Sequence, residues 1–146
     1  MELIEFLAWT FVLYWAHRIA HKTPYIKKWH FHHHAFIVNI GSPGWHWNNL
    51  FLYNDSWIDT MDYWITEVIP TLVFCLVTGA WWIFIFYYIW AAFFQEKFEH
   101  NKNINIPLIT SGCWHLRHHR QYSNNFGVFI TIWDKIFRTE HSYDQC

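Results

Sequence analysis

The chain has 146 residues, a length that predicts one domain covering 1–146, and its formal net charge of −1 argues against a nucleic-acid-binding protein. Aromatic residues make up 23% of the chain and charged residues only 14%, against roughly 25% charged in a typical soluble domain. This is too little charge to cover a water-facing surface, so the composition indicates a membrane protein.

The N-terminal part of the chain predicts two helices that carry histidines. Residues 6–16 are uncharged and apolar, and they lead directly into His17 and His21. Pro24 then interrupts the helix, because proline lacks the backbone N–H. The second helix, from 25 to about 36, carries the stretch WHFHHH. An expression tag normally sits at a terminus, so four imidazoles in the middle of the chain need another explanation.

The longest uncharged segment runs from Val68 to Gln95 and has 28 residues. As one helix it would be about 42 Å long, more than the roughly 30 Å hydrocarbon core of a bilayer. Gly79 divides the segment, and a turn there would keep the histidines before and after it on one side of the membrane. We therefore favour a membrane hairpin at about 60–98. The alternative is a single long tilted helix.

All ten Lys and Arg residues lie in 18–28 and 97–138, beside the histidines, and none lies in 29–96. The positive-inside rule places both basic segments on the cytoplasmic side. The predicted fold class is all-α. We expect an integral membrane helical protein with a short N-terminal membrane helix, the hairpin, and a cytosolic helical cap that carries the histidines.

The histidines recur at helical spacing. His17 and His21 form HxxxH, and HxxHH occurs at 30–34 and again at 115–119. Positions i, i+3 and i+4 share one face of a helix, so each motif directs its imidazoles to one side, whereas His32 points elsewhere. Imidazole is the commonest metal ligand near neutral pH, and eight or nine imidazoles are too many for one tetrahedral site. The pattern predicts two metal ions with about four ligands each.

Two stretches resemble the fatty acid hydroxylase/sterol desaturase superfamily. The first is HRIAHKTPYIKKWHFHHHAF, which is similar to the family pattern of HRxxH, a Pro, a Tyr-Lys pair and HxxHH. The second is HLRHHRQYSNNFGVFITIWDKIF, which is similar to HxxHH followed by Asn-[Tyr/Phe]-Gly and WDxxFGT. Arg138 stands where the family prefers Gly. The chain also lacks the additional N-terminal membrane helices of most members, so we expect a short form, either minimal or completed by homo-oligomerisation.

The resemblance implies an O2-dependent lipid hydroxylase or desaturase that acts on a sterol or fatty acyl substrate. It implies a membrane enzyme, of the endoplasmic reticulum if the source is eukaryotic. The enzyme would have a centre of two iron ions, and zinc could occupy these sites in overexpressed protein. It assigns no catalytic residue beyond the metal ligands. Those ligands are His17, His21, His30, His33, His34, His100, His115, His118 and His119. His46 lies near another family histidine, but its spacing differs by a residue or two, so its role stays open.

Some residues are expected to support this centre. Candidates to orient the imidazoles are Glu96, Glu99, Asn125 and Asp134. The family-matched Asn125-Phe126-Gly127 and Trp133-Asp134 are expected to be mainly structural, with Gly127 allowing a tight turn.

A reaction of this kind needs two reducing equivalents per turnover, and the chain has neither GxGxxG nor a cysteine set for an iron–sulfur cluster. We expect an external donor such as cytochrome b5 or a ferredoxin. It would dock on basic residues beside the histidines: Lys22, Lys27, Lys28, Lys97, Lys102, Arg117 and Arg120. The same residues would otherwise only hold lipid head groups.

Two other functions fit the pattern less well. One is a non-catalytic metal-binding membrane protein, a degenerate relative of the same superfamily. The other is a bis-histidine haem protein, but haem needs only two opposed histidines and leaves the repeated HxxHH motif unexplained.

Overall fold

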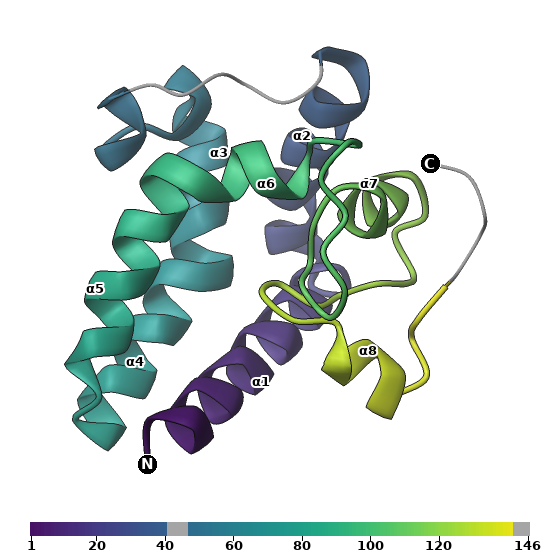
Figure 1. The fold of residues 1–146 in the computed structure, drawn as a ribbon. Helices are drawn as coiled ribbons and strands as arrows, with labels where there is room; N and C mark the ends of the chain where they lie inside the picture. The colour runs from purple at the N-terminus through teal and green to yellow at the C-terminus, as the bar shows by residue number, and fades with distance from the viewer. Residues whose placement is uncertain (41–46, 142–146) are drawn as a thin grey trace.

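The computed structural model describes residues 1–40 and 47–141, and in these ranges the fold is all-helical with no strand, as predicted (Figure 1). Two long helices lead into a helical hairpin, and two short helices follow it. The elements are α1 (Glu2–Ala20), α2 (Pro24–Ile40), η1 (Trp47–Leu50), η2 (Tyr53–Asp55), α3 (Trp57–Tyr63), η3 (Trp64–Val68), α4 (Ile69–Thr78), α5 (Trp81–Trp90), η4 (Ala91–Gln95), α6 (Glu96–Glu99), α7 (Cys113–Arg120) and α8 (Ile132–Ile136).

The two N-terminal helices meet at Pro24, as predicted, and both are longer than predicted. α1 ends at Ala20 and therefore includes His17. α2 begins at Pro24, where a proline loses no helical hydrogen bond because the first N–H of a helix has no intrahelical partner. His46 lies outside the described residues.

The hairpin is built from two continuous helical arms. The first arm runs through α3, η3 and α4, and the second returns through α5, η4 and α6 (Figure 1). Gly79 ends the first arm in the left-handed conformation, with φ 77°, and its N–H donates to the carbonyl of Cys75 at 2.8 Å. The predicted hairpin is therefore confirmed as a fold, and the single long helix is wrong.

The hairpin packs against α1 through an aromatic core. Trp9 and Leu13 of α1 are fully buried together with Tyr87 of α5. The Trp9 ring lies against Phe129, with ring centroids 4.7 Å apart, and its Nε1 donates to Thr71 Oγ1 of α4 at 2.9 Å. This packing fixes the position of α1, and with it the histidines at the C-terminal end of that helix.

The last loop is held by one buried carboxylate. Asp134 accepts hydrogen bonds from the backbone N–H of Phe126 at 2.7 Å and of Gly127 at 2.8 Å, and from Thr139 Oγ1 at 2.7 Å. A side chain at Gly127 would meet the carbonyl oxygen of Ile130 at 2.5 Å, so the turn requires glycine. These contacts give Gly127 and Asp134 a structural role.

Candidate metal centre

The nine histidines singled out from the sequence lie together in two buried groups. Within each group, the candidate ligand atoms all lie within 4.8 Å of one another. The five-histidine cluster comprises His17, His21, His30, His34 and His118. The four-histidine cluster comprises His33, His100, His115 and His119. Every one of these side chains is buried.

Each HxxHH motif is divided between the two clusters. On α2, His30 and His34 enter the five-histidine cluster and His33 enters the other. On α7 the assignment is reversed: His115 and His119 belong to the four-histidine cluster, and His118 belongs to the five-histidine cluster. Residues i and i+4 of a helix are about 40° apart and i+3 is about 100° from i+4, so the motif presents two imidazoles to one site and one to its neighbour.

Three rings of the five-histidine cluster direct an unprotonated nitrogen toward the interior of the cluster. His17 Nδ1–H donates to the Phe126 carbonyl at 2.9 Å and His118 Nδ1–H to the Asn124 carbonyl at 2.6 Å. His30 Nδ1–H donates to the Asp62 carboxylate at 3.0 Å. In neutral form these rings carry only a lone pair on Nε2.

The lone pairs of His17 and His30 repel each other at their distance unless a cation or a proton lies between them. The Nε2 atoms of His17 and His30 are 3.0 Å apart, as are those of His21 and His118. Two metal–nitrogen bonds of about 2.0–2.1 Å at a right angle separate the nitrogens by about 3 Å. The spacing therefore fits a cation bound between the rings.

The four-histidine cluster has the same inner spacing. His119 Nε2 is 3.0 Å from His100 Nε2 and 2.9 Å from His115 Nε2. His100 Nδ1 lies 2.8 Å from Glu96 Oε2, which confirms the expected contact between this carboxylate and an imidazole. The outer nitrogens of His33, His115 and His119 have no hydrogen-bond partner among the described residues.

Burial keeps the rings of His34, His118 and His119 uncharged. Desolvation, followed by repulsion from neighbouring imidazoles, lowers the pKa of His34, His118 and His119 well below the usual value for histidine. Neutral imidazole is the form that binds metal, so the side chains are in the ligating state at pH 7.

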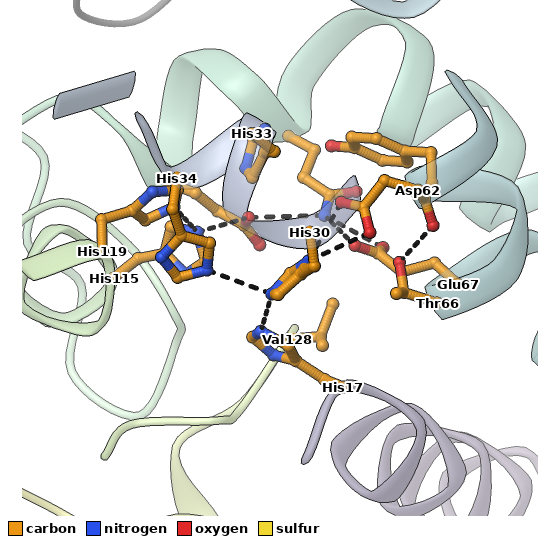
Figure 2. A pocket seen from close by; sticks show the side chains of 13 residues that line it. His17, His30, His33, His34, Asp62, Thr66, Glu67, His115, His119 and Val128 are labelled. Carbon is orange, nitrogen blue, oxygen red and sulfur yellow. Dashed lines mark hydrogen bonds and ion pairs between the residues drawn. The ribbon is translucent and has the colours of Figure 1, made fainter. Parts of the chain in front are cut away.

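A cavity of about 20 Å³ lies between the clusters and the hairpin (Figure 2). It has room for about one water molecule. Figure 2 shows the histidines on one side of it and Asp62, Thr66 and Glu67 on the other. Its lining consists of His17, His30, His33, His34, Asp62, Tyr63, Thr66, Glu67, Gln95, Glu99, His115, His119 and Val128.

The hairpin side of this cavity contains polar residues that sequence reasoning missed. Thr66 and Glu67 lie in η3 and Gln95 lies in η4, and both segments are π-helical. Such segments are rare and frequently occur at functional sites. Gln95 Nε2 donates to Glu67 Oε2 at 3.0 Å across the hairpin. The available signal was a set of acidic residues, Asp59, Asp62 and Glu67, in a segment without Lys or Arg.

The remaining candidates lie away from the two clusters. His32 is outside both, and its half-exposed ring pairs with Asp59 Oδ1 at 2.8 Å. Asn125 has φ 57° and its Nδ2 donates to the Trp114 carbonyl at 3.2 Å. Asp134 holds the last loop. Among the described residues, neither Asn125 nor Asp134 forms a hydrogen bond or ion pair with an imidazole.

Similarity to known proteins covers almost all of the chain. The chain is 27% identical to the Delta(7)-sterol 5(6)-desaturase erg3B of Aspergillus fumigatus over 132 residues. These residues are 90% of this chain and 36% of the relative. The chain is 26% identical over 137 residues to the lathosterol oxidase of Rattus norvegicus, 93% of this chain and 44% of the relative. The human lathosterol oxidase is 26% identical over 148 residues, 99% of this chain and 47% of the relative.

The chain thus spans between about a third and about a half of the length of these curated relatives. No solved structure matches it. The family model for fatty acid hydroxylase matches residues 3–139, which include all nine clustered histidines. The chain belongs to the fatty acid hydroxylase family.

Proposed function

We propose that this protein is an O2-dependent membrane oxidoreductase that desaturates or hydroxylates a lipid at a centre of two iron ions. The observation that carries the proposal is the convergence of nine buried imidazoles in two groups with ligand-like spacing. One ion would be held by the five-histidine cluster and the other by the four-histidine cluster. When bound, the iron ions would supply the redox chemistry that activates O2 for attack on an aliphatic C–H bond.

The chain's own residues supply orientation and enclosure. Asp62, and the carbonyls of Phe126 and Asn124, hold three rings with their Nε2 atoms turned inward. The cavity beside the rings admits a molecule of the size of water or O2 and is lined mainly by buried side chains. Bulk water is therefore kept from the reacting atoms, which favours lipid oxidation over side reactions.

The membrane location is supported by the exposed surface. Trp57–Thr78 is a 22-residue helix long and apolar enough to cross a membrane, and the described residues contain one such helix. Large apolar side chains are also exposed on α1 and on both arms of the hairpin: Leu3, Ile4, Phe11, Val73, Leu76, Val77, Ile85, Phe86 and Ile89. Many exposed apolar side chains on the same three helices are typical of contact with lipid.

The polar ends of the helices support one orientation. The N-terminus of α1 lies beside the hairpin turn, where Trp82 Nε1 donates to Glu5 Oε2 at 2.9 Å (Figure 1). The basic side chains of Lys22, Lys27 and Lys97 are exposed at the opposite end, with the histidines. By the positive-inside rule, we propose that the clusters face the cytosol.

The relatives and the basic residues support proposals for the substrate class and for the electron donor. The curated relatives named above act on sterols, so a sterol is the substrate class that we propose. The exposed lysines beside the clusters would attract an acidic electron donor such as a cytochrome b5-like protein or a ferredoxin, and this attraction would weaken with salt.

The test compares adjacent histidines on α2. Cells would express wild type, His33→Ala or His32→Ala, with metal content measured by elemental mass spectrometry and sterols and fatty acids by lipidomics. We expect about two metal ions per chain and a new lipid product in wild type and in His32→Ala. His33→Ala should bind fewer ions and form no product.

Each other outcome has a distinct meaning. A folded wild-type protein without metal would refute the proposal. Two ions per chain with no lipid product, in cells that also contain an electron donor, would indicate the non-catalytic metal-binding protein instead. Equal loss of metal in His32→Ala and His33→Ala would show that the two clusters are not the binding sites.

A further inference from the structure

The two clusters provide unequal numbers of imidazoles, and a carboxylate stands beside the smaller one. The five-histidine cluster has one ligand more than the other. Glu99, the last residue of α6, is 3% exposed and lines the cavity next to His115. No imidazole of the five-histidine cluster has a recorded contact with Glu99 in the described part of the chain.

The orientation of Glu99 differs from that of the other nearby carboxylates. Asp62 and Glu96 contact the outer nitrogens, Nδ1, of His30 and His100. Glu99 Oε2 instead lies 3.7 Å from Nε2 of His115, the nitrogen that faces His119. It is therefore on the side of the ring from which a metal ion would be bound.

The distance also fits shared coordination better than a hydrogen bond. At 3.7 Å the two atoms are beyond normal hydrogen-bond length. Two ligand atoms at about 2.0–2.2 Å from the same ion lie about 3 to 4 Å apart, depending on the angle. The Glu99 oxygens are not among the atoms that lie within 4.8 Å of one another in the four-histidine cluster, so ligation requires the Glu99 side chain to move toward the ion.

The buried carboxyl group of Glu99 lacks a lysine or arginine partner. No ion pair between such a residue and Glu99 occurs in the described ranges. Its recorded hydrogen-bond donor is Gln95 Nε2 at 3.3 Å, and that same amide nitrogen donates to Glu67 at 3.0 Å. One amide thus serves two carboxylates. A buried carboxylate needs a compensating charge, and a divalent cation in the four-histidine cluster would provide it.

We propose that the Glu99 carboxylate is the fifth ligand of the ion in the four-histidine cluster, with Gln95 as its positioning residue. The inference rests on the proposed function, because it assumes that this cluster binds a metal. It makes the two sites chemically different, since one is ligated by neutral imidazoles alone and the other includes an anionic oxygen. The site with Glu99 should therefore lose affinity selectively when that charge is removed.

The experiment measures zinc and iron binding by wild type, Glu99→Gln and Glu67→Gln in competition with a calibrated chelator. Glu67→Gln is the matched control, because Glu67 accepts from the same amide but has no recorded contact with an imidazole in the described residues. We expect two ions in wild type and in Glu67→Gln. Glu99→Gln should bind one ion normally and the other at least about tenfold more weakly.

Two ions of wild-type affinity in Glu99→Gln would overturn the inference, as would equal weakening of both ions. Because Glu99→Gln could fail to fold, a second measurement uses the wild type alone. An anomalous-difference map of the zinc-loaded protein should place a Glu99 oxygen at about 2.0–2.2 Å from the ion, and a water in that place would reject the ligand. A wild-type protein without any ion would instead refute the proposed function.

Discussion

The five-histidine and four-histidine clusters differ in what holds the far side of their rings. In the first, three of the five rings are anchored through Nδ1: His17 and His30 by Phe126 and Asp62, which are distant in the chain, and His118 by the carbonyl of Asn124, six residues later. The outer nitrogen of His34 has no partner among the described residues. In the second, His100 is anchored by Glu96, four residues earlier on the same helix, and the outer nitrogens of the other three rings have no partner among the described residues.

This difference indicates that the clusters are preorganised to different degrees. Rings that the tertiary structure already orients lose little freedom when an ion binds. Rings without outer partners must be ordered by the ion itself. We therefore expect the five-histidine cluster to bind its ion more tightly and to tolerate the loss of one ligand better.

The largest effect is expected from removing one imidazole of α7 from either cluster. His119→Ala leaves three imidazoles in the smaller cluster and should reduce metal content from about two ions per chain to about one. His118→Ala leaves four in the larger cluster and should keep its ion at saturating metal, although more weakly bound. Lipid product should be lost in both variants. Metal content by elemental mass spectrometry, on folded monodisperse protein, measures the difference, and equal losses would contradict unequal preorganisation.

An intermediate effect is expected from the carboxylates behind the rings. Asp62→Ala leaves the buried Nδ1–H of His30 without its acceptor and should weaken one ion by about 10- to 100-fold. Glu96→Ala should weaken the other ion less, because the Glu96 carbonyl also lies 3.2 Å from His100 Nδ1 and remains in the variant. Chelator competition gives both affinities, with thermal melting as the control for folding. A larger loss in Glu96→Ala than in Asp62→Ala would reverse the comparison.

The smallest effect concerns the turn after α8, which is joined to the loop with the anchoring carbonyls by the hydrogen bond from Asn125 N–H to the Thr139 carbonyl at 2.9 Å. Arg138 has φ 55°, a left-handed conformation that costs a non-glycine residue about 1 kcal/mol. Arg138→Gly should therefore raise the free energy of unfolding by about 1 kcal/mol. Arg138→Ala is the matched control, since it removes the side chain but keeps the strain. Denaturant unfolding in detergent measures both, and equal stability of the two variants would exclude backbone strain at this position.

Much of the architecture follows from local rules that can be applied to the sequence. Pro24 separates α1 from α2 because a proline starts a helix more readily than it continues one. Gly79 turns the hairpin because the left-handed conformation is easily adopted without a Cβ. Arg138 could be marked as unusual at a glycine position, and its positive φ explains why glycine is preferred there.

The sequence by itself also determined which histidines face a common side, because residues spaced as in HxxxH and HxxHH share one face of a helix. The same periodicity explains why residues i and i+4 of each HxxHH motif join one site and i+3 the other, but which site each pair joins was decided by the tertiary structure. It depends on the angle at which α2 and α7 meet, and no local spacing contains that angle. The same holds for Asp62, Glu67, Gln95 and Glu99, which line one cavity because the two hairpin arms face the clusters. Contacts between residues so far apart in the chain arise from packing, and packing is a property of the whole fold.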